Sequence, residues 1–173
     1  LQLGSGVNSS PGGIPPTPTW VYATATGTAN ANSRLYLYLS GAGNAYVDDV
    51  KLVAGTNAGV GPNLLANGDF ESALTGTWSS STDFTNSALS TTTAHSGNSS
   101  LHLVATSGGG GNGDSVQQTI SPALVNGATY TISYWYLPAA PGINLTVKLD
   151  GNILQSTPDI DYTGDVRRLN LGT

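Results

Sequence analysis

The chain has 173 residues, of which only 9% are charged, and its formal net charge is −5. Proteins that bind nucleic acid or an anionic membrane surface need clustered Lys and Arg, so five basic residues in an acidic chain argue against both partners. No apolar run approaches the roughly 18 residues of a membrane-spanning helix, and we expect no membrane insertion.

The leading part of the chain predicts strands. Alternating apolar residues indicate three of them, at residues 20–29, 34–41 and 45–53. In the second, Leu35, Leu37 and Leu39 alternate with Tyr36 and Tyr38, so the leucines share one face and the tyrosines the other. This pattern is typical of a half-buried strand.

From Asn63 the strand pattern restarts. The stretch "NLLANGDFES" at 63–72 predicts a short strand followed by an Asn-Gly turn and a loop. Further strands are expected at residues 87–94, 99–106, 114–121, 129–137 and 144–156. The last is a hairpin, because Asp150-Gly151 suits a type I′ turn. Helical spacing persists nowhere, so we predict an all-β sandwich with little or no helix.

Four motifs carry a family resemblance. They are "NLLANGDFES" at 63–72 with Trp78, "HSGNSSLHL" at 95–103, "ISPALVNGATYTISYWYL" at 120–137, and "RLYLYLSGAGNAYVDDVKLV" at 34–53. Together they look like the jelly rolls of carbohydrate-binding modules of the family 4, 9, 16 and 22 type. The resemblance implies a jelly-roll β-sandwich.

The order of the motifs departs from that family, in which the "NGDFE" strand opens the domain and the "VDDV" strand closes it. We therefore interpret residues 1–53 as a Gly/Pro-rich lead with the closing strands, residues 54–62 as a linker, and residues 63–173 as the opening strands. Together they are equivalent to one module. Three strands alone would leave open edges and an uncovered apolar face.

Two arrangements of these pieces fit the sequence about equally. In one, the chain folds back on itself as a circularly permuted jelly roll. In the other, the leading strands of each copy complete the sandwich of a neighbouring copy, and this head-to-tail exchange builds a filament. A fragment of a tandem array is a third, smaller option.

We predict that the protein is not an enzyme. The chain has no Cys, its only histidines are His95 and His102, and no serine lies in a "GxSxG" elbow. "GGGGNG" at 108–113 precedes no helix and indicates a hairpin loop rather than a phosphate site. Asp48 and Asp49 are adjacent on a strand and are expected to point to opposite faces, which disfavours a general acid and base pair.

A structural calcium ion is implied by the resemblance, since the similar modules hold one near the "GDFE" turn and the "DDV" strand. Applied to this chain, the resemblance implies Glu71 and Asp49 as calcium ligands, with Asp69 or Asp48 and the backbone carbonyls of residues 96–99 in support. A chain without cysteine has no disulfide to stabilise it. Calcium prefers such carboxylate and carbonyl oxygens.

Sugar binding in such modules comes from aromatic rings and polar side chains on a concave sheet. The candidates are Trp135, Tyr36, Tyr38 and Gln117, although these rings are also expected as ordinary core residues.

Two functions follow from these observations. The composition, poor in charge and rich in Ser, Thr and Asn, favours a non-catalytic structural or adhesive module that self-associates or contacts neighbouring modules, with head-to-tail filaments as one form of assembly. The alternative is a carbohydrate-binding module that targets a secreted protein to polysaccharide. The chain starts at Leu1 and lacks Met, so we expect processing from a precursor and an extracellular or cell-surface location.

Overall fold

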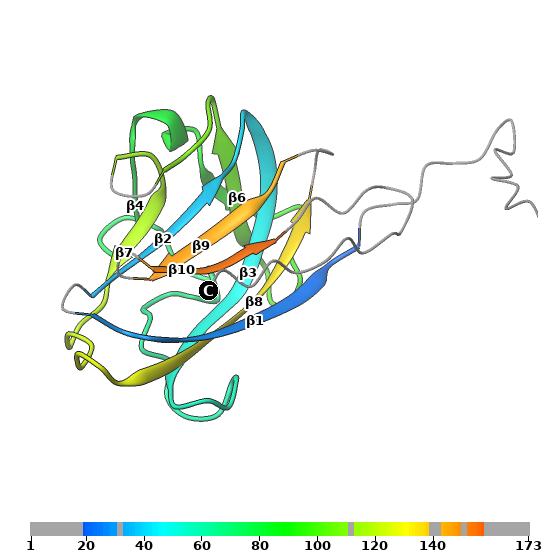
Figure 1. The fold of residues 1–173 in the computed structure, drawn as a ribbon. Helices are drawn as coiled ribbons and strands as arrows, with labels where there is room; N and C mark the ends of the chain where they lie inside the picture. Colours follow the sequence, from blue (N-terminus) through cyan, green and yellow to red (C-terminus); the bar gives the residue numbers. More distant parts are fainter. Residues whose placement is uncertain (1–18, 31–32, 111–112, 139–142, 150–151, 158–173) are drawn as a thin grey trace, which may run out of the picture.

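A computed structural model describes residues 19–30, 33–110, 113–138, 143–149 and, for the backbone alone, 152–157. These residues form two antiparallel five-stranded sheets packed face to face (Figure 1). The first sheet has the order β1-β8-β3-β6-β5, and the second has the order β10-β9-β2-β7-β4. The all-β sandwich that the sequence predicts is therefore confirmed.

The strands have the following bounds: β1 Val21–Thr28, β2 Arg34–Leu39, β3 Gly43–Ala54, β4 Ser79–Ser80, β5 Ala88–Ser90, β6 Ser100–Ala105, β7 Val116–Thr119, β8 Thr129–Pro138, β9 Leu145–Leu149 and β10 Asn152–Thr157. One 3-10 turn, η1, spans Thr82–Phe84. No helix among the described residues is long and apolar enough to cross a membrane.

The leading strands are built into both sheets of the same chain. β3 lies at the centre of the first sheet, where it pairs with β8 and β6. β2 lies at the centre of the second sheet, where it pairs with β9 and β7. β1 pairs with β8 at the edge of the first sheet. Without β2 and β3, each sheet would be split into unconnected pieces, so the two parts of the chain depend on each other. The motif order relative to the family stays a prediction.

The core between the sheets follows the alternation of the sequence. Leu35, Leu37 and Leu39 of β2 are buried in the hydrophobic core. Ile132 and Tyr134 of β8 belong to the same core. The predicted strand at 87–94 shortens to the three residues of β5, and β4 is not foreseen by the sequence pattern. The predicted turn at 150–151, residues 1–18 and part of the loop at 108–113 lie outside the described residues.

The predicted strand at 63–72 is wrong, because side-chain hydrogen bonds replace a regular ladder there. The Asn63 amide accepts from the backbone N–H of Leu52 at 3.0 Å and donates to the carbonyl of Val50 at 3.0 Å. Asn67 and Phe70 then adopt positive φ angles of 49° and 54°. This irregular segment runs along the edge of β3 beyond the last residue that pairs with β6.

The expectation that Asp48 and Asp49 point to opposite faces is also wrong. The register between β3 and β8 shifts between Asp48 and Lys51, and Asp49 has a φ of 51°. Such a bulge inserts extra residues into one strand and redirects its side chains. Both carboxylates consequently reach the same loop, at His95 and Ser96.

Candidate functional site

The outward side of the second sheet carries a row of polar side chains, which we call the polar face. Because side chains alternate along a strand, the residues opposite the core leucines of β2 share this side with their partners on the neighbouring strands. The polar face consists of Arg34, Tyr36 and Tyr38 of β2, Gln117 and Thr119 of β7, Ser79 of β4, and Thr146 and Lys148 of β9.

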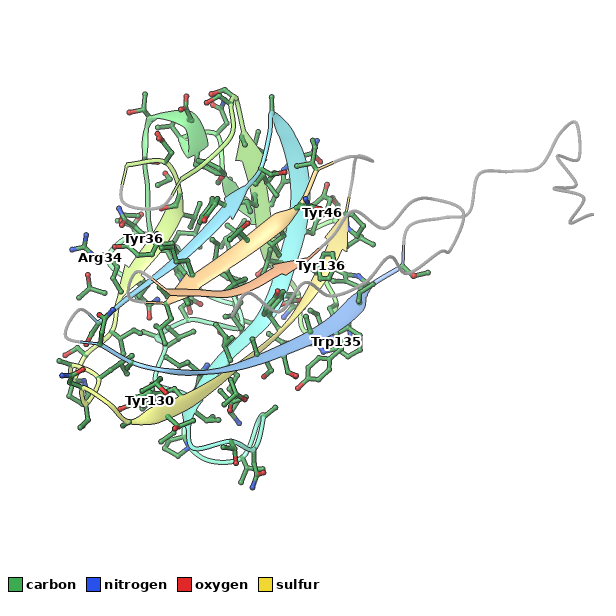
Figure 2. All side chains as sticks on the ribbon, viewed as in Figure 1. Arg34, Tyr36, Tyr46, Tyr130, Trp135 and Tyr136 are labelled. Atoms are coloured by element: carbon green, nitrogen blue, oxygen red, sulfur yellow. The ribbon has the colours of Figure 1, made fainter. Side chains whose placement is uncertain are left out.

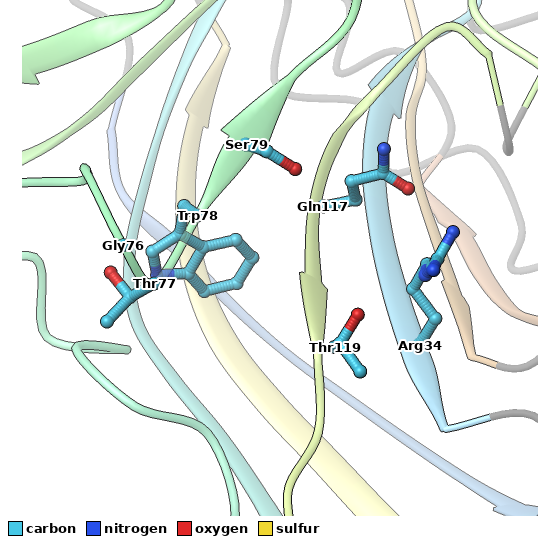
Figure 3. A pocket seen from close by; sticks show the side chains of 7 residues that line it. All are labelled: Arg34, Gly76, Thr77, Trp78, Ser79, Gln117 and Thr119. Carbon is cyan, nitrogen blue, oxygen red and sulfur yellow. The ribbon is translucent and has the colours of Figure 1, made fainter.

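A pocket of about 390 Å³ opens at one end of the polar face (Figure 3). It is lined by Arg34, Gly76, Thr77, Trp78, Ser79, Gln117 and Thr119. Trp78 is 5% exposed, and its indole packs on Phe70 and donates a hydrogen bond to the carbonyl of Asn67 at 3.0 Å. The indole wall is thus fixed in place, while Arg34 and Thr119 are exposed on the opposite side.

Gln117 is the group in this pocket whose hydrogen bonding is incomplete. Its side-chain oxygen is buried and has no partner among the described residues. The adjacent Gln118 shows the contrast, because its amide both accepts from and donates to the backbone of Ala66, at 2.9 and 2.8 Å. Buried polar atoms in folded proteins are nearly always paired, so this lone acceptor is an exception, as are His102 Nε2 and the Tyr134 hydroxyl elsewhere in the described residues.

The two tyrosines of the polar face form its floor. Tyr36 and Tyr38 are only 5% and 8% exposed, so neither offers a free ring face. Gly109 lies directly over Tyr38, where any Cβ on the glycine would collide with the tyrosine side chain. Burial raises the pKa of the Tyr38 hydroxyl, although a hydrogen bond with Thr146 opposes this effect. The sequence suggests that sugars stack on these rings, but the structure leaves little room for such stacking.

Trp135 lies on the other side of the sandwich, on the outward side of β8 (Figure 2). Its indole stacks on the His95 ring, with centroids 3.9 Å apart and planes 14° apart, and meets Tyr22 at 5.1 Å. Tyr22 is 48% exposed, and the ring of Trp20 meets His95 edge-on at 5.6 Å. The structure therefore brings Tyr36, Tyr38 and Gln117 together but separates Trp135 from them.

Three carboxylates hold the loop that precedes β6. Asp48, fully buried, accepts from the N–H groups of His95 at 2.8 Å, Ser96 at 3.2 Å and Asp49 at 2.7 Å. Burial raises the pKa of Asp48, and these three donors oppose the rise. Asp49 contacts His95 Nδ1 at 2.9 Å and accepts from the Ser96 hydroxyl at 2.9 Å.

Glu71 is the third carboxylate. It accepts from the N–H groups of Ser99 at 3.0 Å and Asn98 at 2.8 Å and from the Asn98 side chain at 3.1 Å, and these bonds lower its pKa. Gly97, with a φ of 60°, packs so tightly on Glu71 that a Cβ there would collide with the carboxylate.

This arrangement does not fit a shared cation. All six oxygens of Asp48, Asp49 and Glu71 already have a hydrogen-bond partner, five of them in the loop and the sixth at the N–H of Asp49. Among the described residues, no three His, Asp or Glu side chains lie together as metal ligands. Asp69 is exposed and has no described side-chain partner. The expected calcium ion stays a prediction, which its removal can test.

Sequence reasoning misses four of the residues around the pocket. Arg34 and Thr119 could be placed on the polar face by alternation alone, since each lies two residues from Tyr36 or Gln117. Ser79 and Trp78 carry no such signal, because β4 is only two residues long.

A family model described as a carbohydrate binding domain matches residues 62–166, more than half of the chain. Searches of curated proteins and of solved structures gave no match.

Proposed function

The chain belongs to the family of carbohydrate binding domains, and on that premise we propose that it binds polysaccharide, without cleaving it, at the polar face of the second sheet. The family match supports this function better than the structural or filament-forming function that the composition favours, for which self-association still awaits a test.

The unpaired oxygen of Gln117 in the pocket is the observation that carries the proposal. A sugar hydroxyl both donates and accepts hydrogen bonds. Once its side chain rotates to expose the buried oxygen, Gln117 can accept the sugar proton, while the Arg34 guanidinium donates to the sugar oxygen. Thr119 and Ser79 add hydroxyls that do either. These groups lie on three adjacent strands, which fixes their spacing before a ligand arrives.

The fixed indole of Trp78 borders the pocket, but at 5% exposure it offers no more free ring face than Tyr36, so the proposed binding depends mainly on hydrogen bonds. A second pocket of about 370 Å³ shares Gly76, Trp78 and Ser79 with the first and also includes Leu74 and Val116. Because the two pockets share a wall, the polar face can bind more than one sugar unit of a polymer.

Affinity gel electrophoresis with a panel of neutral and acidic polysaccharides tests the proposal. We expect at least one polymer to retard the wild-type protein, and Gln117→Ala to weaken this binding by about tenfold, the effect of one hydrogen bond. Trp135→Ala, on the opposite sheet, serves as the control and should leave binding unchanged. Loss of binding in Trp135→Ala but not in Gln117→Ala would move the site to the first sheet.

A further inference from the structure

The positive charges of the chain are concentrated on the polar face. Of the three basic residues in the described part of this acidic chain, two, Arg34 and Lys148, lie there. The third, Lys51, lies on the first sheet and donates to the carbonyl of Gly59 at 2.7 Å. The polar-face positions of β2, β4, β7 and β9 carry no Asp or Glu.

Neither of the two cations has a partner among the described residues. Within the described residues the one ion pair joins His95 to Asp49, and the side chains of Arg34 and Lys148 make no hydrogen bond or ion pair. Asp48, Asp49 and Glu71 contact the loop before β6, and Asp83 contacts Thr106 and Ser107.

The register places both cations beside the same site. Lys148 lies directly opposite Tyr36, and Arg34 lies two residues before Tyr36 on the same side of β2. Diagonal neighbours of this kind are roughly 7–8 Å apart. One anionic group above Tyr36 can therefore contact both side chains. Arg34 also borders the pocket, so this anion would belong to a ligand that enters there.

We propose that the polar face selects polysaccharides that carry carboxylate groups, such as uronic-acid polymers, with Arg34 and Lys148 binding the carboxylate. This inference rests on the proposed function and names the ligand class of the same site. The planar guanidinium of Arg34 matches the two oxygens of a carboxylate, and Lys148 adds a point charge. A neutral polysaccharide would leave both charges unpaired.

The test compares two forms of one polymer, polygalacturonate and its methyl ester, in which a methyl group replaces the negative charge of each carboxylate. We expect the acid form to bind at least about fivefold more tightly at low salt, and this preference to decline in 1 M NaCl, where the Debye length falls to about 3 Å. Lys148→Gln should reduce the binding of the acid form about fivefold and leave binding of the ester nearly unchanged. Arg34→Gln should reduce the binding of the acid form more than that of the ester, since Arg34 also donates to sugar hydroxyls in the pocket.

Lys51→Gln is the matched control, since it removes one positive charge from the other sheet. Its binding of the acid form should equal that of the wild type. An equal loss of binding in all three variants would show that only the net charge of the protein matters, and would overturn the inference. Equal binding of acid and ester by the wild type would also overturn it, but would leave the proposed function intact. Failure of the wild type to bind any polysaccharide in the panel would overturn both.

Discussion

The carboxylate of Asp48 accepts a hydrogen bond from the backbone N–H of His95 at 2.8 Å, although the two residues are 47 positions apart. This bond joins β3 to the loop before β6. It ties the leading part of the chain to the part that the family model matches. Asp48 also accepts from Ser96 and Asp49, so its removal leaves three N–H groups without an acceptor.

Asp48→Ala should therefore destabilise the protein by about 2–3 kcal/mol, because buried donors that lose a charged acceptor bear the cost of their desolvation. For a chain of this length the loss corresponds to a decrease in Tm of about 4–12 °C, measured by circular dichroism. Asp69→Ala is the control, since Asp69 is exposed and has no described side-chain partner. Equal Tm values for the two variants would contradict the role assigned to Asp48.

The hydrogen bonds to Glu71 predict a pH dependence. The N–H groups of Ser99 and Asn98 lower the pKa of Glu71 in the folded state. A carboxyl group with a lowered pKa stabilises the fold above its unfolded pKa of about 4.3, and this contribution is lost as the pH falls through the folded value. Glu71→Gln cannot titrate. The Tm difference between wild type and Glu71→Gln should be largest near pH 7 and shrink below about pH 4.

Thermal melting of both proteins between pH 3 and pH 7 measures this difference. A gap that stays constant, or widens toward low pH, would show that the Glu71 carboxylate is not stabilised by these N–H donors.

The same three carboxylates make the calcium expectation testable. Because all six oxygens already have a hydrogen-bond partner in the loop or, in one case, at the N–H of Asp49, the geometry predicts that the Tm of wild-type protein is unchanged by EGTA and by millimolar calcium. A rise in Tm with calcium that Asp49→Asn or Glu71→Gln abolishes would instead establish the ion that the resemblance implies, and would require the loop to rearrange.

The central positions of β2 and β3 predict that the part of the chain from residue 63 onward does not fold alone. Without β2, β9 and β7 would lose their shared neighbour, and without β3, β8 and β6 would lose theirs. A fragment of residues 63–173 should show no cooperative thermal transition, whereas the whole chain should show one. Addition of a separate peptide of residues 19–54 should restore the transition. A fragment that melts cooperatively at the same temperature as the whole chain would contradict this interdependence.

Much of the fold can be read from the sequence because its strands alternate strictly. The positions of Leu35, Leu37 and Leu39 predict both the course of β2 and the side of the sheet that faces the core, whereas the pairing of Gln117 with Tyr36 comes from the register of β7 on β2. The β3 bulge cannot be read this way, because nothing in "VDDV" indicates that Asp49 adopts a positive φ.

The sequence prediction of the site fails for Trp135 for a different reason. Alternation tells which residues share a face of one strand, but not which sheet that strand joins. β8 joins the first sheet and β2 the second, so Trp135 and Tyr36 end on opposite sides of the molecule. The exposure of an aromatic ring cannot be predicted from the sequence pattern either, since Tyr38 is covered by Gly109, which is far away in the sequence.

The location of the sugar site on the second sheet is tested most directly by amide chemical-shift mapping. The ¹⁵N-labelled protein would be titrated with an oligosaccharide of whichever polymer binds most tightly. We predict that the perturbed amides cluster at Arg34, Tyr36, Gln117, Thr119 and Lys148, with no shift at Tyr22, Tyr46 or Trp135. Perturbations confined to those last three residues, on the outward side of the first sheet, would contradict the account.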